Sequence, residues 1–285
     1  MKIPKRIQPL IDDGLVDDVI GQLMSGKEAS VFTVLCGEEI RCAKVYKEAS
    51  QRSFKKAAQY LEGRKSRNSR RGRAMEKGSK YGRAQQEKAW QTAEVDALYK
   101  CAEAGVRVPR PFGCFDGVLL MDLITDEDGD VAPRLNDVMM SEEQALEDHA
   151  QMMVYVTRML CAGIVHGDLS EFNVLVDEYG PVIIDLPQAV DASANNNAEV
   201  MLARDVNNMT SYYAQFAPQL AATQYAKEMW ALYEKGLLTP DTELTGLFEE
   251  DTTSADVDGI LDEIEAAYYE EQERRERISD AESTT

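Results

Sequence analysis

The sequence predicts an α+β protein of two lobes: a β-rich N-terminal lobe that carries one long helix, and a mainly helical C-terminal lobe. Strand-like segments dominate the first part of the chain, and helical patterns dominate the part after about residue 125. With 285 residues and a hydrophobic fraction of 44%, the chain can bury a sizeable core. We expect an N-terminal lobe over 1–124, a C-terminal lobe over 125–240, and an acidic helix and tail over 241–285.

The N-terminal lobe is predicted to combine five strands with one helix. Short runs rich in β-branched and aromatic residues favour strands, and Gly and Pro residues mark their ends. The helix is expected over 85–103 and ends before Gly105. The expected strands cover 18–24, 30–36, 40–46, 112–115 and 118–124.

A helix from Ser141 to about residue 162 is expected in the C-terminal lobe. Ser141 and Gln144 have the spacing of a capping box, and Gly163 ends the pattern. We place His149 on the surface of this helix. Its apolar stripe is predicted at Leu146, Ala150, Met153 and Leu160. Five methionines are assigned to the core: Met139, Met140, Met152, Met153 and Met159.

The net charge of −20 at pH 7 argues against a general affinity for nucleic acid. The charge is uneven, because residues 51–88 hold 13 of the 31 Lys and Arg residues and only three acidic ones. This basic loop is expected to be solvated, and it is a candidate contact for RNA or an acidic partner. No apolar run approaches the roughly 20 residues that cross a bilayer, and the cysteines form no C-x-x-C pair. We therefore expect a cytoplasmic protein without a membrane anchor, a disulfide framework or a zinc site.

A turn near residue 26 has donors suited to phosphate. Residues 21–27 match the start of a P-loop, but Glu28 stands where that motif needs a hydroxyl, and a strand pattern follows instead of a helix. The alternative is a turn between two strands, in which Gly26 allows close backbone approach. Its side-chain donors would be Ser25, Lys27 and Ser30.

Lys44 lies on a predicted strand between apolar neighbours, an arrangement found where a lysine reaches the α and β phosphates of ATP. Such a lysine needs a carboxylate to hold its ammonium group. Glu87 and Glu94 both lie on the predicted helix, and we favour Glu94 because it sits in the middle of that helix.

The segment HGDLSEFNVL, residues 166–175, contains a further pattern. Asp168 and Asn173 are five positions apart, as in the loop where an Asp accepts the proton of an attacking hydroxyl and an Asn binds Mg²⁺. Asp185 follows an apolar strand-like run, where a second carboxylate would hold the metal. Lysine, metal ligands and an Asp near the nucleophile are the groups that phosphoryl transfer requires.

The segments SGKEASVF, CAKVY, HGDLSEFNVL and IIDLPQAVD together resemble the RIO family of atypical serine/threonine protein kinases, most nearly its first subgroup. The resemblance covers about residues 14–216. It implies a reduced two-lobed protein-kinase-like fold that holds ATP and Mg²⁺, or Mn²⁺, between its lobes and lacks the usual activation loop.

By position, the resemblance also implies roles for individual residues. Ser25, Lys27 and Ser30 would lie in the phosphate-covering loop, and Lys44 and Glu94 would form an ion pair. Asp168 would be the catalytic Asp, and His166 would brace its loop. Met121 would be the gatekeeper, with the backbone of Asp122 and Ile124 against adenine. Asn173 and Asp185 would bind the metal, and Asp185 is also the site where family members form an aspartyl phosphate.

Three functions stay open on the sequence. The first is a protein serine/threonine kinase or autokinase that uses Asp168, with an unknown protein substrate. The second is a small-molecule phosphotransferase of the aminoglycoside or choline type, because that class shares HGDL followed by Asn. The third is a nucleotide-gated binding module in which slow ATP hydrolysis changes a partner surface such as the basic loop.

Overall fold

The computed structural model describes residues 3–26, 28–47 and 93–249. The chain divides into two compact units, residues 1–247 and residues 248–285, and the fold below is that of the first. Several expectations therefore lie outside the described residues. They are Lys27, Glu87, the basic loop 51–88, the first part of the predicted helix 85–103, and most of the acidic segment 241–285.

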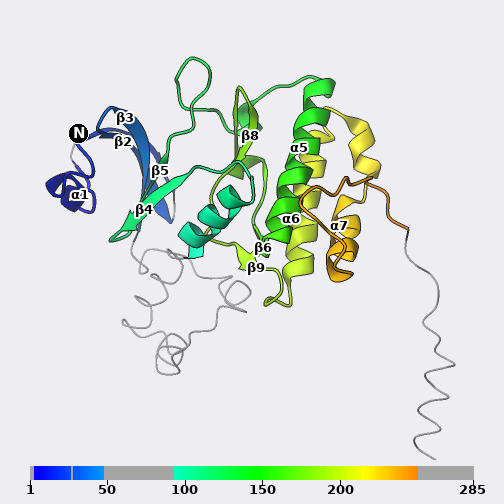
Figure 1. Ribbon diagram of the computed structural model, residues 1–285. Helices are drawn as coiled ribbons and strands as arrows, with labels where there is room; N and C mark the ends of the chain where they lie inside the picture. The colour runs from blue at the N-terminus through cyan, green and yellow to red at the C-terminus, as the bar shows by residue number, and fades with distance from the viewer. Residues whose placement is uncertain (1–2, 27, 48–92, 250–285) are drawn as a thin grey trace, which may run out of the picture. The chain divides into compact units, whose positions relative to one another are not determined.

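One antiparallel sheet of five strands forms the N-terminal part of the molecule (Figure 1). The strand order is β1-β2-β3-β5-β4, so β5 lies between β3 and β4. All five predicted strands are present, although the last ends two residues earlier than expected. Their bounds are β1 Asp18–Ser25, β2 Ala29–Cys36, β3 Glu39–Tyr46, β4 Pro111–Phe115 and β5 Val118–Asp122.

The two faces of this sheet have different environments because successive side chains of a strand point to opposite sides. On one face, Ala43 and Val45 of β3 pack in a cluster with Ile7 and with Leu10 of the short helix α1, Gln8–Asp12. On the other face, Tyr46 belongs to the large core shared with the helical part of the chain. The sheet thus presents Lys44 and Tyr46 toward the C-terminal lobe.

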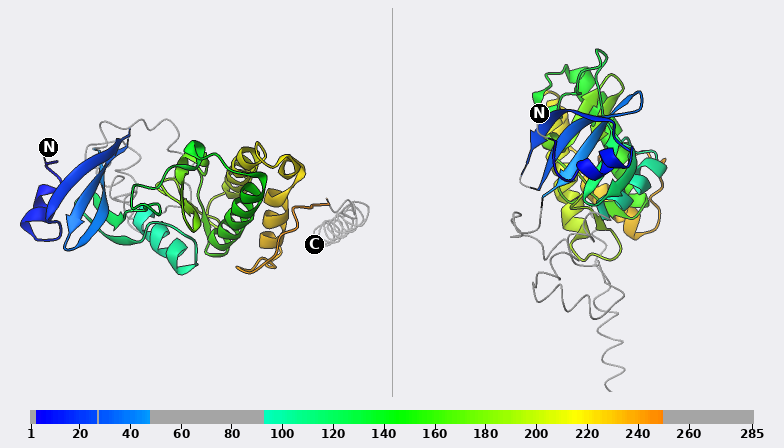
Figure 2. Two further views of the ribbon diagram at one scale, coloured as in Figure 1. Left: turned by 90° about the horizontal axis from the view of Figure 1, so that it is seen from above. Right: turned by 90° about the vertical axis from the view of Figure 1, so that its left-hand side faces the viewer.

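Helices dominate the rest of the chain, which confirms the predicted α+β class (Figures 1 and 2). Residues 93–103 are helical and end before Gly105, as expected. The larger helices are α5 Glu142–Cys161, α6 Ala198–Tyr213 and α7 Tyr225–Glu234. Short strands complete this part: β6 Ile164–Val165, β7 Val174–Asp177, β8 Gly180–Ile183 and β9 Val190–Asp191. Three 3₁₀ turns connect them: η2 Leu135–Asp137, η3 Glu171–Asn173 and η4 Pro218–Ala222.

Helix α5 begins and ends where the sequence predicts, with one difference at its cap. The hydroxyl of Ser141 accepts a hydrogen bond from the N–H of Gln144 at 3.1 Å. The side chain of Gln144 does not return to the cap; it donates to Asp148 Oδ1 at 2.9 Å, so only half of the capping box forms. Gly163, with φ of 76°, supplies the left-handed residue after the helix.

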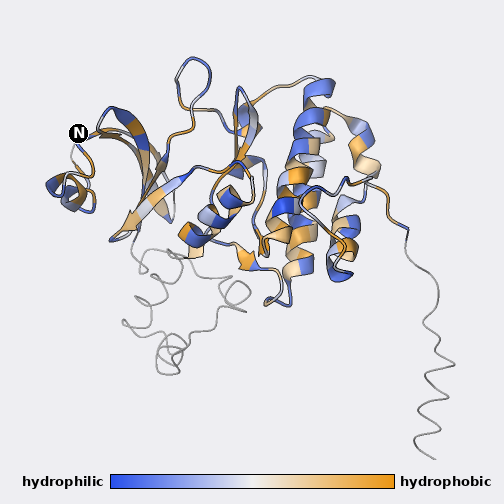
Figure 3. Cartoon of the chain, in the orientation of Figure 1, coloured by the Kyte–Doolittle hydropathy of each residue, from blue (hydrophilic) through white to orange (hydrophobic). Residues whose placement is uncertain are grey.

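The surroundings of α5 correct two expectations. His149 is buried and not on the surface, because α6 and α7 both cover its side of the helix: its Nε2 lies 3.0 Å from Thr210 Oγ1, and its ring contacts Tyr213 and Tyr225. Ala150 of the predicted stripe is exposed. Hydrophobic residues recur along α5, α6 and α7 in Figure 3.

The methionines fall into two groups. Met152, Met153 and Met159 are buried in the core as expected, and Met140 packs against it. Met139 does not, since 86% of it is exposed in the segment that leads to α5. It lies before the helix, where no neighbouring element covers it, and this explains why assigning it to the core from its residue type alone was wrong.

Within the part of the chain that the structure describes, no helix is long and apolar enough to span a bilayer.

The buried His149 gives a prediction about the pH dependence of stability. Burial lowers the pKa of His149 from 6.5 to about 4, so the unfolded chain takes up a proton at His149 that the folded chain refuses. The wild type should therefore lose up to roughly 3 kcal/mol of unfolding free energy from this residue as pH falls from about 6.5 to about 4.

His149→Gln should remove that loss while keeping a polar group near Thr210. We expect the variant to be less stable than the wild type at neutral pH and to close this gap as the pH falls. Chemical denaturation of both proteins at several pH values measures the difference. A gap that stays constant with pH would show that His149 does not resist protonation.

Candidate active site

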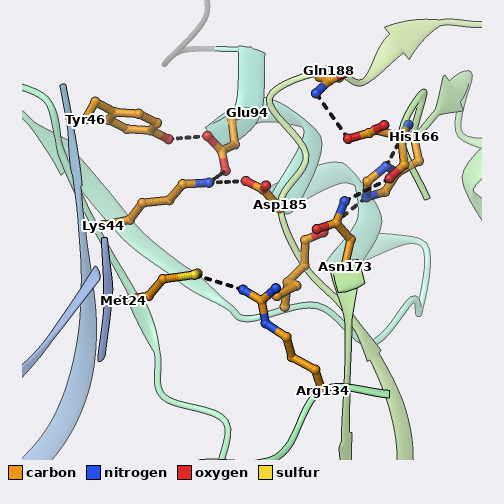
Figure 4. Close-up of polar contacts among 11 residues, drawn as sticks. Met24, Lys44, Tyr46, Glu94, Arg134, His166, Asn173, Asp185 and Gln188 are labelled. Atoms are coloured by element: carbon orange, nitrogen blue, oxygen red, sulfur yellow. Dashed lines mark hydrogen bonds and ion pairs between the residues drawn. The ribbon is translucent and has the colours of Figure 1, made fainter. Parts of the chain in front are cut away.

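Lys44 lies between two carboxylates that come from different elements (Figure 4). Its Nζ is 2.6 Å from Glu94 Oε1, on the helical segment 93–103, and 2.5 Å from Asp185 Oδ1, after β8. Burial by itself lowers the pKa of Lys44, but the charges of Asp185 and Glu94 outweigh it, and the net shift is upward. The ammonium group is therefore charged at neutral pH.

Tyr46 supplies a second contact to Glu94, which the sequence did not suggest. Its hydroxyl donates to Glu94 Oε2, so each oxygen of this buried carboxylate has a donor. Burial and then the charge of Glu94 raise the pKa of Tyr46 well above its usual value, which keeps the hydroxyl protonated as the donor. Lys44 and Tyr46 are two positions apart on β3, and that spacing would have placed both on one face.

Asp185 combines an ionised side chain with an unusual backbone. It has φ of 65°, a region that residues other than glycine seldom occupy. Desolvation raises the pKa of its carboxyl, but the charge and hydrogen bond of Lys44, together with the charge of Arg134, act in the opposite direction, and the net pKa is below the ordinary value. The side chain of Asp185 remains 46% exposed, and this ionised carboxylate is open to a ligand on the side away from Lys44.

Asn173 is joined to both parts of the site. Its side-chain Nδ2 donates to the backbone carbonyl of Asp168 at 2.8 Å, and the backbone carbonyl of Asn173 accepts from the N–H of Ile184 at 3.0 Å. The amide oxygen of Asn173 is thus the atom left for a metal ion, next to the strand end that carries Asp185. Oxygen donors of this kind suit a hard divalent cation.

The donor set fits a metal held together with a nucleotide. Among the described residues, no group of three or more His, Cys, Asp or Glu side chains is placed to hold a metal ion alone. Mg²⁺ in phosphoryl-transfer sites is commonly held by one or two protein carboxylates together with substrate phosphates and water. Asn173 and Asp185 match that smaller protein contribution.

The backbone of Asp168 is fixed by its neighbours. Its N–H donates to Nδ1 of His166 at 3.3 Å, and the Nε2 of His166 lies 3.1 Å from the carbonyl of Ile184. Both contacts are satisfied by the neutral ring that carries its proton on Nε2. The buried His166 therefore braces the loop, as its sequence context implies.

Asp205 of α6 holds the same loop from the other side. Its two carboxylate oxygens accept the N–H groups of Gly167 at 2.7 Å and Leu169 at 3.0 Å, the residues on either side of Asp168. Arg204 donates to the carbonyl of Gly167, and Asn208 donates to that of Leu169 at 3.0 Å. These contacts span more than 35 positions in the chain, so no local pattern indicated them.

The turn between β1 and β2 carries hydroxyls and a lysine. Ser25 Oγ and Ser30 Oγ are 3.2 Å apart across the turn. Lys47, which the sequence reasoning missed, donates to the carbonyl of Gly26 at 2.5 Å and lies 3.4 Å from Ser25 Oγ. Because β2 follows this turn directly, the P-loop interpretation is excluded by the structure.

The expected adenine region lies at the end of β5. Met121 is partly buried there and packs against the large core. The N–H of Asp122 donates to the carbonyl of Arg110, and the carbonyl of Ile124 accepts from Ala132, both at 3.0 Å. Contact of a base with the backbone of Asp122 and Ile124 stays a prediction.

Asp205 yields a prediction that stability measurements can test. Desolvation raises the pKa of its carboxyl from 3.8 to about 6, although the hydrogen bonds from the N–H groups of Gly167 and Leu169 act in the opposite direction. A raised folded pKa contributes stability below the unfolded value, and that stability is lost as pH rises through about 6.

Asp205→Asn removes this pH-dependent contribution to stability but keeps the shape of the side chain. The unfolding free energy of the variant relative to the wild type should rise by up to roughly 3 kcal/mol between about pH 4 and pH 7. Hydrogen exchange should quicken at Gly167 and Leu169, since an amide offers one acceptor oxygen in place of two. A relative stability that does not change with pH would contradict the raised pKa.

Comparison with known proteins gives a consistent family. The RIO domain profile matches residues 30–227. The chain is 35% identical over 208 residues to a RIO-type serine/threonine-protein kinase Rio1 of Haloferax volcanii, which covers 73% of this chain and 67% of the relative. It is 31% identical over 198 residues to the Rio1 kinase of Methanocaldococcus jannaschii, covering 69% of this chain and 63% of the relative.

A human relative, serine/threonine-protein kinase RIO1, is 32% identical over 206 residues. That match covers 72% of this chain but 34% of the human protein, so the chain spans about a third of this longer relative. The family profile covers more than half of this chain and includes Lys44, Asp168, Asn173 and Asp185. The chain belongs to the RIO domain family.

Proposed function

We propose that this protein transfers the γ-phosphate of ATP to a serine or threonine hydroxyl of a protein, itself included, with Mg²⁺ as the metal. The observation that carries the proposal is the position of Lys44 between Glu94 and Asp185, close to a loop that fixes Asp168 and Asn173. Kinship with RIO-type serine/threonine kinases supports a protein as the acceptor.

The nucleotide side of the reaction uses charged groups. Lys44 is the cation available to phosphate oxygens, and the oxygens of Asn173 and Asp185 would hold the metal. When bound, the cation would supply positive charge that offsets the charge of the phosphate oxygens. The turn between β1 and β2 would cover the phosphates with Ser25 and Ser30, and Lys27, which lies outside the described residues, is expected to contribute there too. Met121, Asp122 and Ile124 would border the adenine.

Asp168 serves the acceptor side. An exposed carboxylate on a fixed loop can accept a hydrogen bond from the attacking hydroxyl, orient it, and take its proton as the new P–O bond forms. The bond from the γ-phosphorus to the bridging oxygen breaks in the same step, and ADP leaves.

The other two functions find less support. A small-molecule phosphotransferase would share the lysine and the metal ligands, but the relatives reported above are named protein kinases. A nucleotide-gated module remains compatible with transfer to Asp185, in which its carboxylate would attack the γ-phosphorus as the bond to the bridging oxygen breaks and ADP leaves. Water would later hydrolyse the aspartyl phosphate, which releases phosphate and restores the carboxylate. An RNA or acidic partner at the basic loop 51–88 and a cytoplasmic location stay part of the proposal. The five free thiols agree with a reducing compartment.

Labelled ATP with Mg²⁺ tests the proposal through the fate of the γ-phosphate. Wild-type protein should acquire acid-stable label on Ser or Thr. Asp168→Asn should reduce this labelling by about 100-fold or more, because the amide cannot take the proton. Asp185→Asn should abolish it through loss of the metal ligand.

Nucleotide binding and treatment with hydroxylamine complete the experiment. Asp168→Asn should still bind ATP, since Asp168 is not on the nucleotide side, and this separates catalytic loss from misfolding. Label that hydroxylamine removes, together with slow phosphate release, would replace the kinase proposal by a cycle through an aspartyl phosphate. Turnover of small hydroxyl compounds without protein labelling would favour the small-molecule alternative.

A further inference from the structure

Gln188 contacts the carboxylate of Asp168, and neither the sequence pattern nor the proposed reaction accounts for it. Its Nε2 donates to Asp168 Oδ2 at 3.2 Å (Figure 4). Gln188 comes three residues after Asp185, in the segment that leads to β9. It therefore reaches the catalytic loop from the strand end that carries a proposed metal ligand.

The backbone around Gln188 is firmly held. Leu186 and Ala189 are buried, and the N–H of Ala189 donates to the carbonyl of Leu186 at 3.1 Å, which closes a turn around Gln188. Because its flanking residues are buried and the turn is closed, the Cα atom from which the Gln188 side chain extends has little freedom to move.

A short pairing sets the distance between the two side chains. Val165 of β6 pairs with Val190 of β9, and Ile164 pairs with Asp191. β6 leads directly into the loop that carries Asp168, and Gln188 lies two residues before β9. Gln188 and Asp168 are thus attached to two paired strands, and their contact follows from the fold.

Two further contacts of Asp168 act on its backbone. His166 accepts from its N–H, and Asn173 donates to its carbonyl, so these residues place the Cα atom of Asp168. The direction of the carboxylate depends on groups that touch its oxygens, and Gln188 is such a group.

The chemistry of an amide suits this role. It donates a hydrogen bond without adding positive charge, so it can orient a carboxylate without neutralising it or competing for phosphate. A lysine or arginine at the same place would form an ion pair with the carboxylate.

We propose that Gln188 is a positioning residue for phosphoryl transfer, whose side-chain amide donates to Oδ2 of Asp168 and thereby sets the direction of this carboxylate toward the acceptor hydroxyl. The inference rests on the proposed function and adds to it a residue outside the HGDLSEFN loop. Gln188 touches neither nucleotide nor acceptor in this scheme, so it acts only through Asp168.

The test compares Gln188→Leu, Gln188→Glu and Gln188→Lys by self-phosphorylation with labelled ATP and Mg²⁺. Leu removes the donor, Glu replaces it by a repelling carboxylate of the same shape, and Lys restores a donor. We expect the rate of transfer to fall about 10- to 100-fold for Leu and Glu, on the scale of a misoriented catalytic group. The KM for ATP should stay within about threefold. Lys should recover only part of the rate, because it restores a donor but its charge weakens Asp168 as a proton acceptor.

Gln219→Leu is the matched control, because Gln219 also donates to a carboxylate, Glu142 Oε1 at 2.9 Å, far along the chain from the loop. This variant should transfer phosphate at the wild-type rate. A wild-type rate in Gln188→Leu would overturn the inference, as would a loss that appears in the KM for ATP and not in the rate.

A double substitution separates this inference from the proposed function. In an Asp168→Asn background, Gln188→Leu should cause almost no further loss, because the group it positions is already gone. A further loss as large as in the wild type would show that Gln188 acts elsewhere. Absence of Asp168-dependent transfer in the wild type would instead overturn the proposed function itself, and the positioning role with it.

Discussion

The ammonium group of Lys44 holds together three parts of the molecule: β3, the helical segment that carries Glu94, and the end of β8 with Asp185. A buried charge without a partner costs free energy, so moving any one of these elements away would leave an unpaired charge on the others. The two carboxylates exceed the single cation by one negative charge. That excess lies toward Asp185, the more exposed of the two, where a metal ion would balance it.

A second constraint acts on the loop that carries Asp168: the ionised Asp205 that holds this loop by hydrogen bonds also lowers the stability of the fold. Desolvation raises the pKa of Asp205, so its ionised form reduces the stability of the fold near neutral pH. Only a carboxylate offers an acceptor oxygen to each of the N–H groups of Gly167 and Leu169. The ionised Asp205 thus holds the segment that carries Asp168, in keeping with the tendency of perturbed groups to gather at functional sites.

Local sequence patterns predicted the five strands of the N-terminal sheet, the bounds of α5 and the residues nearest the proposed chemistry. Lys44 between apolar neighbours and the spacing of Asp168 and Asn173 are short-range signals, and the structure brings those side chains to one place. The sequence did not indicate the burial of His149 or the contacts of Tyr46, Asp205 and Gln188. Each depends on which distant element packs against it, and no periodicity within one segment contains that information.

The distribution of charge around the site follows from its two tasks. On the nucleotide side, Lys44 is a full cation, because anionic phosphates are stabilised by positive charge. Around Asp168, two donors are neutral amides: that of Gln188 at its carboxylate and that of Asn173 at its backbone carbonyl. A cation touching Asp168 would favour its ionised form and weaken it as a proton acceptor. The amides of Gln188 and Asn173 avoid this effect, because each restricts the geometry of Asp168 without adding positive charge to its carboxylate.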